Sequence, residues 1–214
     1  MRRPDRCARV LYAACLFMIS LSCANLALAQ AKPADLDKAL VLVRSTTTNL
    51  LAAVSTQQAA IAADPNHALR LVIEHVGPHI DIVRSAKRVL GRHWRGATAA
   101  QRERFIAEFR VMLMRTYATA IAENPQVLVE YLPVRARRKY EAIVETNIPR
   151  SGDGNIAVHY RLHNRDGEWK IFDVTIAGIS LLVTYKASFD QIVRREGIDA
   201  LLDALAAKNK SNSS

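Results

Sequence analysis

Ser180, His75 and His79 have side chains that could do chemistry, but their sequence context argues against it. Ser180 lies in Gly-Ile-Ser-Leu-Leu, which begins like the nucleophile elbow of a hydrolase and lacks the second glycine that lets that turn close. His75 and His79 have the spacing of two metal ligands on a helix, yet Gly77-Pro78 interrupts the helical pattern between them. We therefore predict a helix-start or buried hydroxyl for Ser180, and surface or capping roles for the histidines.

Two further pairs, His159 with His163 and Glu141 with Glu145, fall on the polar side of alternating patterns typical of strands. Four residues along a strand span roughly 13 Å, which is too far for one metal ion. Carboxylates paired for acid–base catalysis would face an apolar cavity instead. Asp173 is the one acid inside an apolar run, and we interpret it as a hydrogen-bonded structural residue, with a catalytic base as the alternative. No metal site and no catalytic site is predicted.

Residues 1–29 have the pattern of an export signal: a basic start, an apolar run and the small-residue site Ala27-Leu28-Ala29. We expect cleavage after Ala29. The signal contains all 3 cysteines, so the mature protein has no disulfide, cysteine nucleophile or cysteine ligand. It also carries four Arg and one Asp, a net +3, which leaves +7 of the +10 total for the mature chain. This charge suits anionic headgroups or acidic protein surfaces better than nucleic acid.

The first half of the mature chain has helical periodicity. Apolar residues predict one long amphipathic helix over 35–63 and a second helical segment over 69–90 that is interrupted at Gly77-Pro78. A break at 91–96 precedes a helix that begins with the capping box Thr98-Ala-Ala-Gln101 and runs to about Glu123. Each of these helices has an apolar face that must pack against another element of the fold.

The second half changes to a period of two. Alternation predicts strands over 140–148 and 155–163, and a third strand that begins at Glu168, with turns at 151–154 and 164–167. A fourth strand is expected at 127–132, and helical spacing returns over 182–192 and 198–205. The pattern therefore predicts an α+β fold with helices packed on an antiparallel sheet. We expect one domain, residues 30–207, followed by a polar tail, 208–214.

Three blocks of this sequence are distinctive: SAKRVLGRHWRGATAAQRERFIAEFRVMLMRTYATAI (85–121), GEWKIFDVTIAGISLLVTYKASFDQIV (167–193) and REGIDALLDAL (195–205). Together they resemble the toluene-tolerance (MlaC) family of periplasmic phospholipid-binding proteins. The resemblance implies an NTF2-like fold in which helices and a curved sheet enclose an apolar cavity for phospholipid acyl chains. A hopanoid-associated branch of the same family fits these blocks equally well.

The family's members are lipid carriers, not enzymes. The resemblance therefore implies a monomeric periplasmic protein that needs no cofactor and holds a phospholipid as cargo. The implied partners are an outer-membrane lipoprotein complex and an inner-membrane ABC transporter with an MCE-domain subunit. Nucleic acid is not an expected partner.

Periodicity places a set of apolar side chains on the faces that would enclose this cavity. The candidate lipid-binding residues are Val76, Ile80, Val83, Phe109, Met112, Val144, Ile156, Val158, Tyr160, Phe172, Val174, Ile176, Leu182, Tyr185 and Phe189. Some of these side chains are expected to form solid core instead.

A basic run, Arg135, Arg137, Arg138 and Lys139, lies where a strand should begin. It either protects a sheet edge from pairing with another chain or docks on anionic membranes and acidic partners. Two rivals to the carrier remain from other classes of protein. One is a cavity isomerase or hydratase that uses Asp173 with Tyr160 or Tyr185, and the other is a solid interaction module that carries no ligand.

Overall fold

The described part of the chain opens with a helix that spans most of one side of the molecule, α2 (Pro33–Thr56). The structure is a computed structural model, and it describes residues 33–64, 66–150 and 154–211. All elements below belong to one unit, residues 31–214. The predicted export signal and the centre of the turn at 151–154 lie outside the described residues.

The helical half of the chain follows the predicted segments with two differences. The helix expected over 35–63 is broken at Gln57 into α2 and α3 (Gln58–Ala63). The Thr56 hydroxyl donates to the carbonyls of Ala52 and Ala53, a local bond that competes with the helical ladder at this point. The break expected at 91–96 contains a short helix, α6 (His93–Gly96).

The other α-helices of this half were predicted, namely α4 (Asn66–His75), α5 (Ile82–Leu90) and α7 (Ala99–Ala122). The predicted interruption at Gly77-Pro78 is a short 3-10 helix, η1 (Gly77–His79). The capping box is confirmed, because the Thr98 hydroxyl accepts from the Gln101 amide and the Gln101 side chain accepts from the Thr98 amide.

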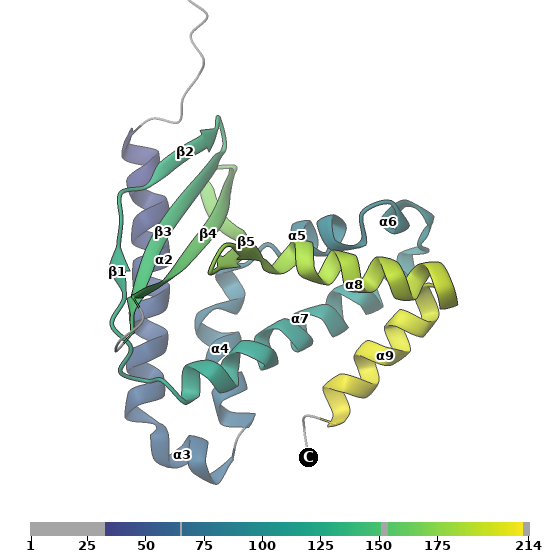
Figure 1. Cartoon of the computed structure of the whole chain (residues 1–214), viewed down its shortest axis with the longest axis horizontal. Helices are drawn as coiled ribbons and strands as arrows, with labels where there is room; N and C mark the ends of the chain where they lie inside the picture. The colour runs from purple at the N-terminus through teal and green to yellow at the C-terminus, as the bar shows by residue number, and fades with distance from the viewer. Residues whose placement is uncertain (1–32, 65, 151–153, 212–214) are drawn as a thin grey trace, which may run out of the picture. The chain divides into compact units, whose positions relative to one another are not determined.

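The second half forms the predicted antiparallel meander. Its strands are β3 (Glu141–Pro149), β4 (Asn155–Arg165) and β5 (Glu168–Ile176), with short additions β1 (Glu130–Tyr131), β2 (Arg135–Arg138) and β6 (Ile179–Ser180). The sheet order is β1-β3-β4-β5-β6, and β2 also pairs with β3. The strand expected over 127–132 is thus much shorter than predicted. Figure 1 shows α2 and α4 beside this sheet and α7, α8 and α9 extending away from it.

Two helices end the fold, α8 (Leu181–Glu196) and α9 (Ile198–Ser211). The second continues into the expected polar tail, because the buried Asn209 donates to the carbonyl and the carboxylate of Glu108 on α7. Residues 208–211 are therefore part of the packed helix.

The face of the sheet that α2 covers is apolar. Ala39 and Val43 of α2 pack against Ala142, Val144 and Leu162. On β5 the alternation is shifted by a bulge, since Asp173 pairs with Arg161 while Ile171 pairs with Leu162. The extra residue is Phe172.

The opposite face carries ion pairs, two of which correct the sequence analysis. Glu141 and His163 were placed on a wet face, yet both are buried, because α5 covers this end of the strands. Glu141 accepts from Arg84 at 2.7 Å, and His163 lies 2.7 Å from Asp81, whose carboxylate also caps α5. The polar side of a strand pattern here meets a polar helix face instead of solvent.

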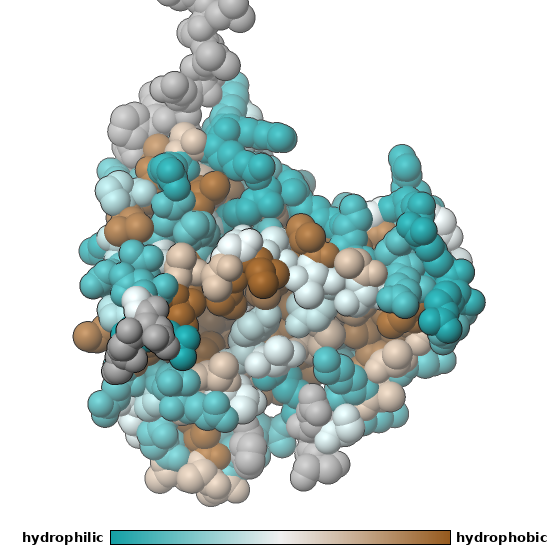
Figure 2. Space-filling model, in the orientation of Figure 1, coloured by the Kyte–Doolittle hydropathy of each residue, from teal (hydrophilic) through white to brown (hydrophobic). Residues whose placement is uncertain are grey.

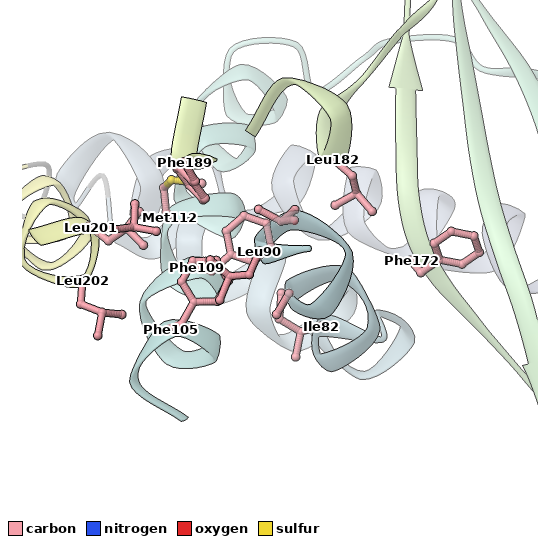
Figure 3. Close-up of a cluster of buried hydrophobic side chains, with 13 residues drawn as sticks. Ile82, Leu90, Phe105, Phe109, Met112, Phe172, Leu182, Phe189, Leu201 and Leu202 are labelled. Carbon is pink, nitrogen blue, oxygen red and sulfur yellow. The ribbon is translucent and has the colours of Figure 1, made fainter. Parts of the chain in front are cut away.

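A solid aromatic cluster lies between α5, α7, α8 and α9. Phe105 and Phe109 stack with ring centroids 5.3 Å apart, and Phe189 meets both rings edge-on at 5.9 and 6.0 Å. Leu201 and Leu202 of α9 close the cluster. Figure 3 shows these side chains in contact, with Phe172 on its strand apart from them.

Candidate ligand cavity

A cavity of about 530 Å³ separates the sheet from the helices. Its walls come from α2, α4, α7, the strands β3 to β5 and the start of α8. In Figure 2 brown, hydrophobic side chains gather around a hollow between the strands and α7. The cavity is therefore open to the surface on one side.

The helical wall is built from stripes at helical spacing. Val43, Thr46, Thr47, Leu50 and Leu51 of α2 line it, positions that fall on one face of a helix with 3.6 residues per turn. The end of α7 contributes a second stripe, and the loop after it closes that side. Those residues are Leu113, Met114, Tyr117, Ala120, Ile121, Asn124, Val127 and Val129.

The sheet wall follows the period of two. Ile156, Val158 and Tyr160 of β4 face the cavity, and Val174 and Ile176 lie opposite Tyr160 and Val158 on β5. Successive side chains of a strand point to opposite faces, so alternate residues of neighbouring strands form one continuous apolar wall.

Asp173 fastens the strand β5 to the start of α8. One carboxylate oxygen accepts from Ser180 Oγ at 2.9 Å and from Arg161 Nη1 at 3.2 Å, and the other accepts from the Leu182 amide at 3.3 Å. Ser180 in turn is the N-cap of α8. The predictions that Asp173 is a hydrogen-bonded structural residue and that Ser180 starts a helix are confirmed. These three contacts hold the carboxylate between β4, β5 and the start of α8.

The polar groups of the wall are neutral with few exceptions. Burial, together with the neighbouring Tyr185, raises the pKa of Tyr117 well above its ordinary value. Burial likewise raises the pKa of Tyr160. Both phenols stay protonated at neutral pH, so the wall offers no charge in its tyrosines. Apart from Asp173, the charged residue that lines the cavity is Arg150, at the end of β3.

Most of the predicted lining residues border the cavity. These are Val76, Ile80, Ile156, Val158, Tyr160, Phe172, Val174, Ile176 and Leu182. Phe172 borders the cavity, but its ring packs against three arginines. The guanidinium carbons of Arg84, Arg88 and Arg161 lie 4.8, 4.4 and 4.9 Å from the ring centroid.

Other predicted lining residues lie elsewhere. Phe109, Met112 and Phe189 belong to the solid aromatic cluster, and Tyr185 packs against it. Val144 is fully buried under α2, and Val83 is 41% exposed on the outer side of α5. An apolar stripe on a helix does not reveal which element covers it. In α7, one part of the apolar surface packs against α8 and α9, and another part lines the cavity.

The α2 stripe and the end of α7 were missed as cavity wall. Their signal was present as the amphipathic pattern, which assigns an apolar face without saying whether that face meets side chains or empty space. Among the described residues, no group of three or more His, Cys, Asp or Glu could hold a metal ion. None of the described helices is long and apolar enough to cross a membrane.

The basic run lies at the far end of β3 from Arg150. Arg135 pairs with Glu145, while Arg138 and Lys139 border a surface groove between α5 and the strand ends. Arg84, Lys87 and Arg165 also line this groove. Three segments that are distant in sequence thus bring cations together.

Comparison with known proteins gives consistent relationships. The family model described as MlaC protein matches residues 44–207. The intermembrane phospholipid transport system binding protein MlaC of Haemophilus influenzae is 26% identical over 76% of this chain and 78% of its own length. The toluene tolerance protein ttg2D of Pseudomonas putida is 26% identical over 78% of this chain and 79% of its own.

The fold also has a solved relative. The phospholipid-binding protein of Ralstonia solanacearum, determined in complex with a phospholipid, superposes with a TM-score of 0.74 at 27% identity, over 81% of this chain and 98% of the other.

Proposed function

This chain belongs to the MlaC family, and we propose that it is a carrier that buries the acyl chains of a phospholipid in its cavity. The observation that carries the proposal is an open apolar cavity in a chain whose solved relative was determined with a phospholipid bound. The enclosing walls are mainly aliphatic side chains and neutral phenols. Such a surface suits hydrocarbon and offers few groups for chemistry.

The free energy of chain transfer explains why a carrier needs this shape. Each methylene exposed to water costs about 0.8 kcal/mol, so one long acyl chain costs on the order of 10 kcal/mol. A cavity that covers most of the chains removes most of this cost. The headgroup can remain at the mouth, in water.

Our proposal places the carrier in the periplasm after cleavage of the export signal. There it takes lipid between an outer-membrane lipoprotein complex and an inner-membrane ABC transporter with an MCE-domain subunit, as a monomer without a cofactor. Two observations favour this function over a cavity isomerase or hydratase. The Asp173 carboxylate already accepts hydrogen bonds from Ser180, Arg161 and the Leu182 amide, and a relative is named for phospholipid transport.

Native mass spectrometry of the protein purified from a bacterial host tests the proposal. We expect a bound lipid at close to one per chain, with a phosphorus-containing headgroup identified after solvent extraction. A hopanoid without phosphate in the extract would instead place the protein in the hopanoid-associated branch. A protein that carries no lipid would contradict the carrier function.

The basic groove supports a docking site for acidic partners. Its cations are Arg84, Lys87, Arg138, Lys139 and Arg165, against the acids Asp81 and Glu141. Because the groove lies at the far end of β3 from Arg150, a partner seated there would leave the cavity mouth open. We propose that this groove adds to the attraction of acidic surfaces on the transport complexes.

Charge replacement tests this docking. Changing Arg138 and Lys139 to Gln should weaken association with the inner-membrane complex and flatten its dependence on salt. The same change at Arg110, an exposed arginine of α7 outside the groove, serves as the control. If both variants bind the complex equally well, the basic run protects the sheet edge and does not dock on partners.

A further inference from the structure

Arg150 is an exposed, charged residue that lines the cavity. It lies at the end of β3 and lines the cavity together with Ile148 and Pro149 before it and Ile156 across the hairpin. Resting on the proposed carrier function, we propose that the Arg150 guanidinium binds the phosphate of the lipid headgroup at the cavity mouth. The ligand class is a phosphodiester carried by two acyl chains.

The charges of the cavity wall point to this residue. Asp173 and Arg150 are the charged residues among those that line the cavity. The Asp173 carboxylate is matched by Arg161, whose Nη1 lies 3.2 Å from it, and is further bound by Ser180 and the Leu182 amide. The wall is therefore left with one uncompensated positive charge, which equals the single negative charge of a phosphodiester.

Several arginines near the sheet already have acidic partners. Arg84 and Arg88 pair with Glu141, Arg135 with Glu145, and Arg165 with Asp166. The Arg150 side chain has no hydrogen bond or ion pair to any residue within 33–64, 66–150 and 154–211, and it is exposed. Its donors are therefore available to a ligand, while the paired arginines are occupied.

The backbone holds Arg150 in place at the rim. Its amide donates to the Gly154 carbonyl at 3.1 Å, and the preceding Pro149 pairs with Asn155. Arg150 is thus held beside the paired ends of β3 and β4, where it lines the cavity. Its planar fork can donate two parallel hydrogen bonds to phosphate oxygens, which a lysine cannot do with the same geometry.

This position predicts selectivity for phosphate without selectivity among headgroups. The acyl chains lie against aliphatic walls that contact hydrocarbon of any lipid. Arg150 would contact the phosphate, a group that phosphatidylethanolamine and phosphatidylglycerol share and that diacylglycerol lacks. The residue therefore distinguishes a phospholipid from a neutral lipid with the same chains.

A competition between two lipids tests the proposal. Delipidated protein is mixed with phosphatidylglycerol and diacylglycerol that carry identical acyl chains, and the ratio of the two bound lipids is measured by native mass spectrometry. We expect Arg150→Gln to lower the ratio of phosphatidylglycerol to diacylglycerol by about two- to fivefold relative to wild type, the range of a solvent-exposed charge pair. Arg150→Lys should retain part of the preference, and high salt should reduce the difference.

Arg110→Gln is the matched control and should keep the wild-type ratio, because Arg110 does not line the cavity. An unchanged ratio in Arg150→Gln, or an equal loss in Arg110→Gln, would overturn the headgroup site while leaving the carrier function intact. Wild-type protein that binds neither lipid would overturn both.

Discussion

The two apolar interiors of this protein differ in how they are filled. Between α5, α7, α8 and α9, the rings of Phe105, Phe109 and Phe189 pack at 5.3 to 6.0 Å and leave a solid cluster. Between α2, the end of α7 and the sheet, aliphatic side chains face each other across about 530 Å³ of space. Two apolar regions therefore end in opposite states of packing.

Side-chain size and backbone separation together explain the difference. In the solid cluster, large rings from α7 and α8 reach across the space between the helices. On the cavity side, Tyr160 reaches Thr47 of α2. Val158 and Val174 of the sheet and Thr46 of α2 are short side chains, so much of the space between these walls stays open. Protein interiors are normally packed as densely as organic crystals. A cavity of this size in an apolar region points to a ligand that completes the packing.

The largest expected effect on stability comes from truncation of a large ring in the solid cluster. Phe109→Ala should lower the free energy of unfolding by about 3–5 kcal/mol, because it removes a buried ring and leaves a void that neighbours cannot fill. Ile156→Ala, the matched change in the cavity wall, should cost about 1 kcal/mol. Urea unfolding of the lipid-free protein measures both. Equal losses would show that the two regions are packed alike.

The hydrogen bonds of Asp173, which join β5 to the start of α8, should contribute nearly as much to the free energy of unfolding. Asp173→Ala leaves Arg161, Ser180 and the Leu182 amide without their acceptor, and we expect a loss of about 2–4 kcal/mol. Asp173→Asn keeps one acceptor oxygen and should lose less. Thermal unfolding of the three proteins tests this order. A fully stable Asp173→Ala variant would refute the structural role.

Replacement of a valine by tryptophan should distinguish the cavity from the packed core. Val144 is fully buried under α2, so Val144→Trp should cost about 1–3 kcal/mol or more through overpacking. Val158→Trp places the same ring into the cavity and should cost less than about 1 kcal/mol. It should nevertheless reduce the bound lipid measured by solvent extraction. Normal lipid content in Val158→Trp would argue that the cargo lies elsewhere.

The smallest expected effect is a pH response on the helical side. His93 and Arg194 hold the pKa of Asp190 down to about 2 from its ordinary 3.8. Because the unfolded state binds this proton more readily, the stabilisation is present above pH 3.8 and is lost as pH falls towards 2. Asp190→Asn should therefore flatten the acid dependence of stability within this window, and only there. An unchanged acid profile would count against the shifted pKa.

Local patterns predicted much of the fold. The switch from helical spacing to a period of two located the meander, and Thr98 with Gln101 located the start of α7. The bulge at Phe172 was not predicted, although the adjacent apolar residues Ile171 and Phe172 interrupt the alternation at this point. The burial of Glu141 and His163 was missed because it depends on α5 crossing the polar face.

The sequence by itself determined which faces are apolar and roughly where helices and strands begin, and it favoured structural roles for Asp173 and Ser180. It also carried the family resemblance that the comparisons bear out. Only the tertiary structure decided which apolar faces meet and which remain apart, and so separated Phe109 from Val158. The physical reason is that periodicity reports the direction of each side chain, whereas a cavity depends on the distance between backbones that lie far apart in the chain.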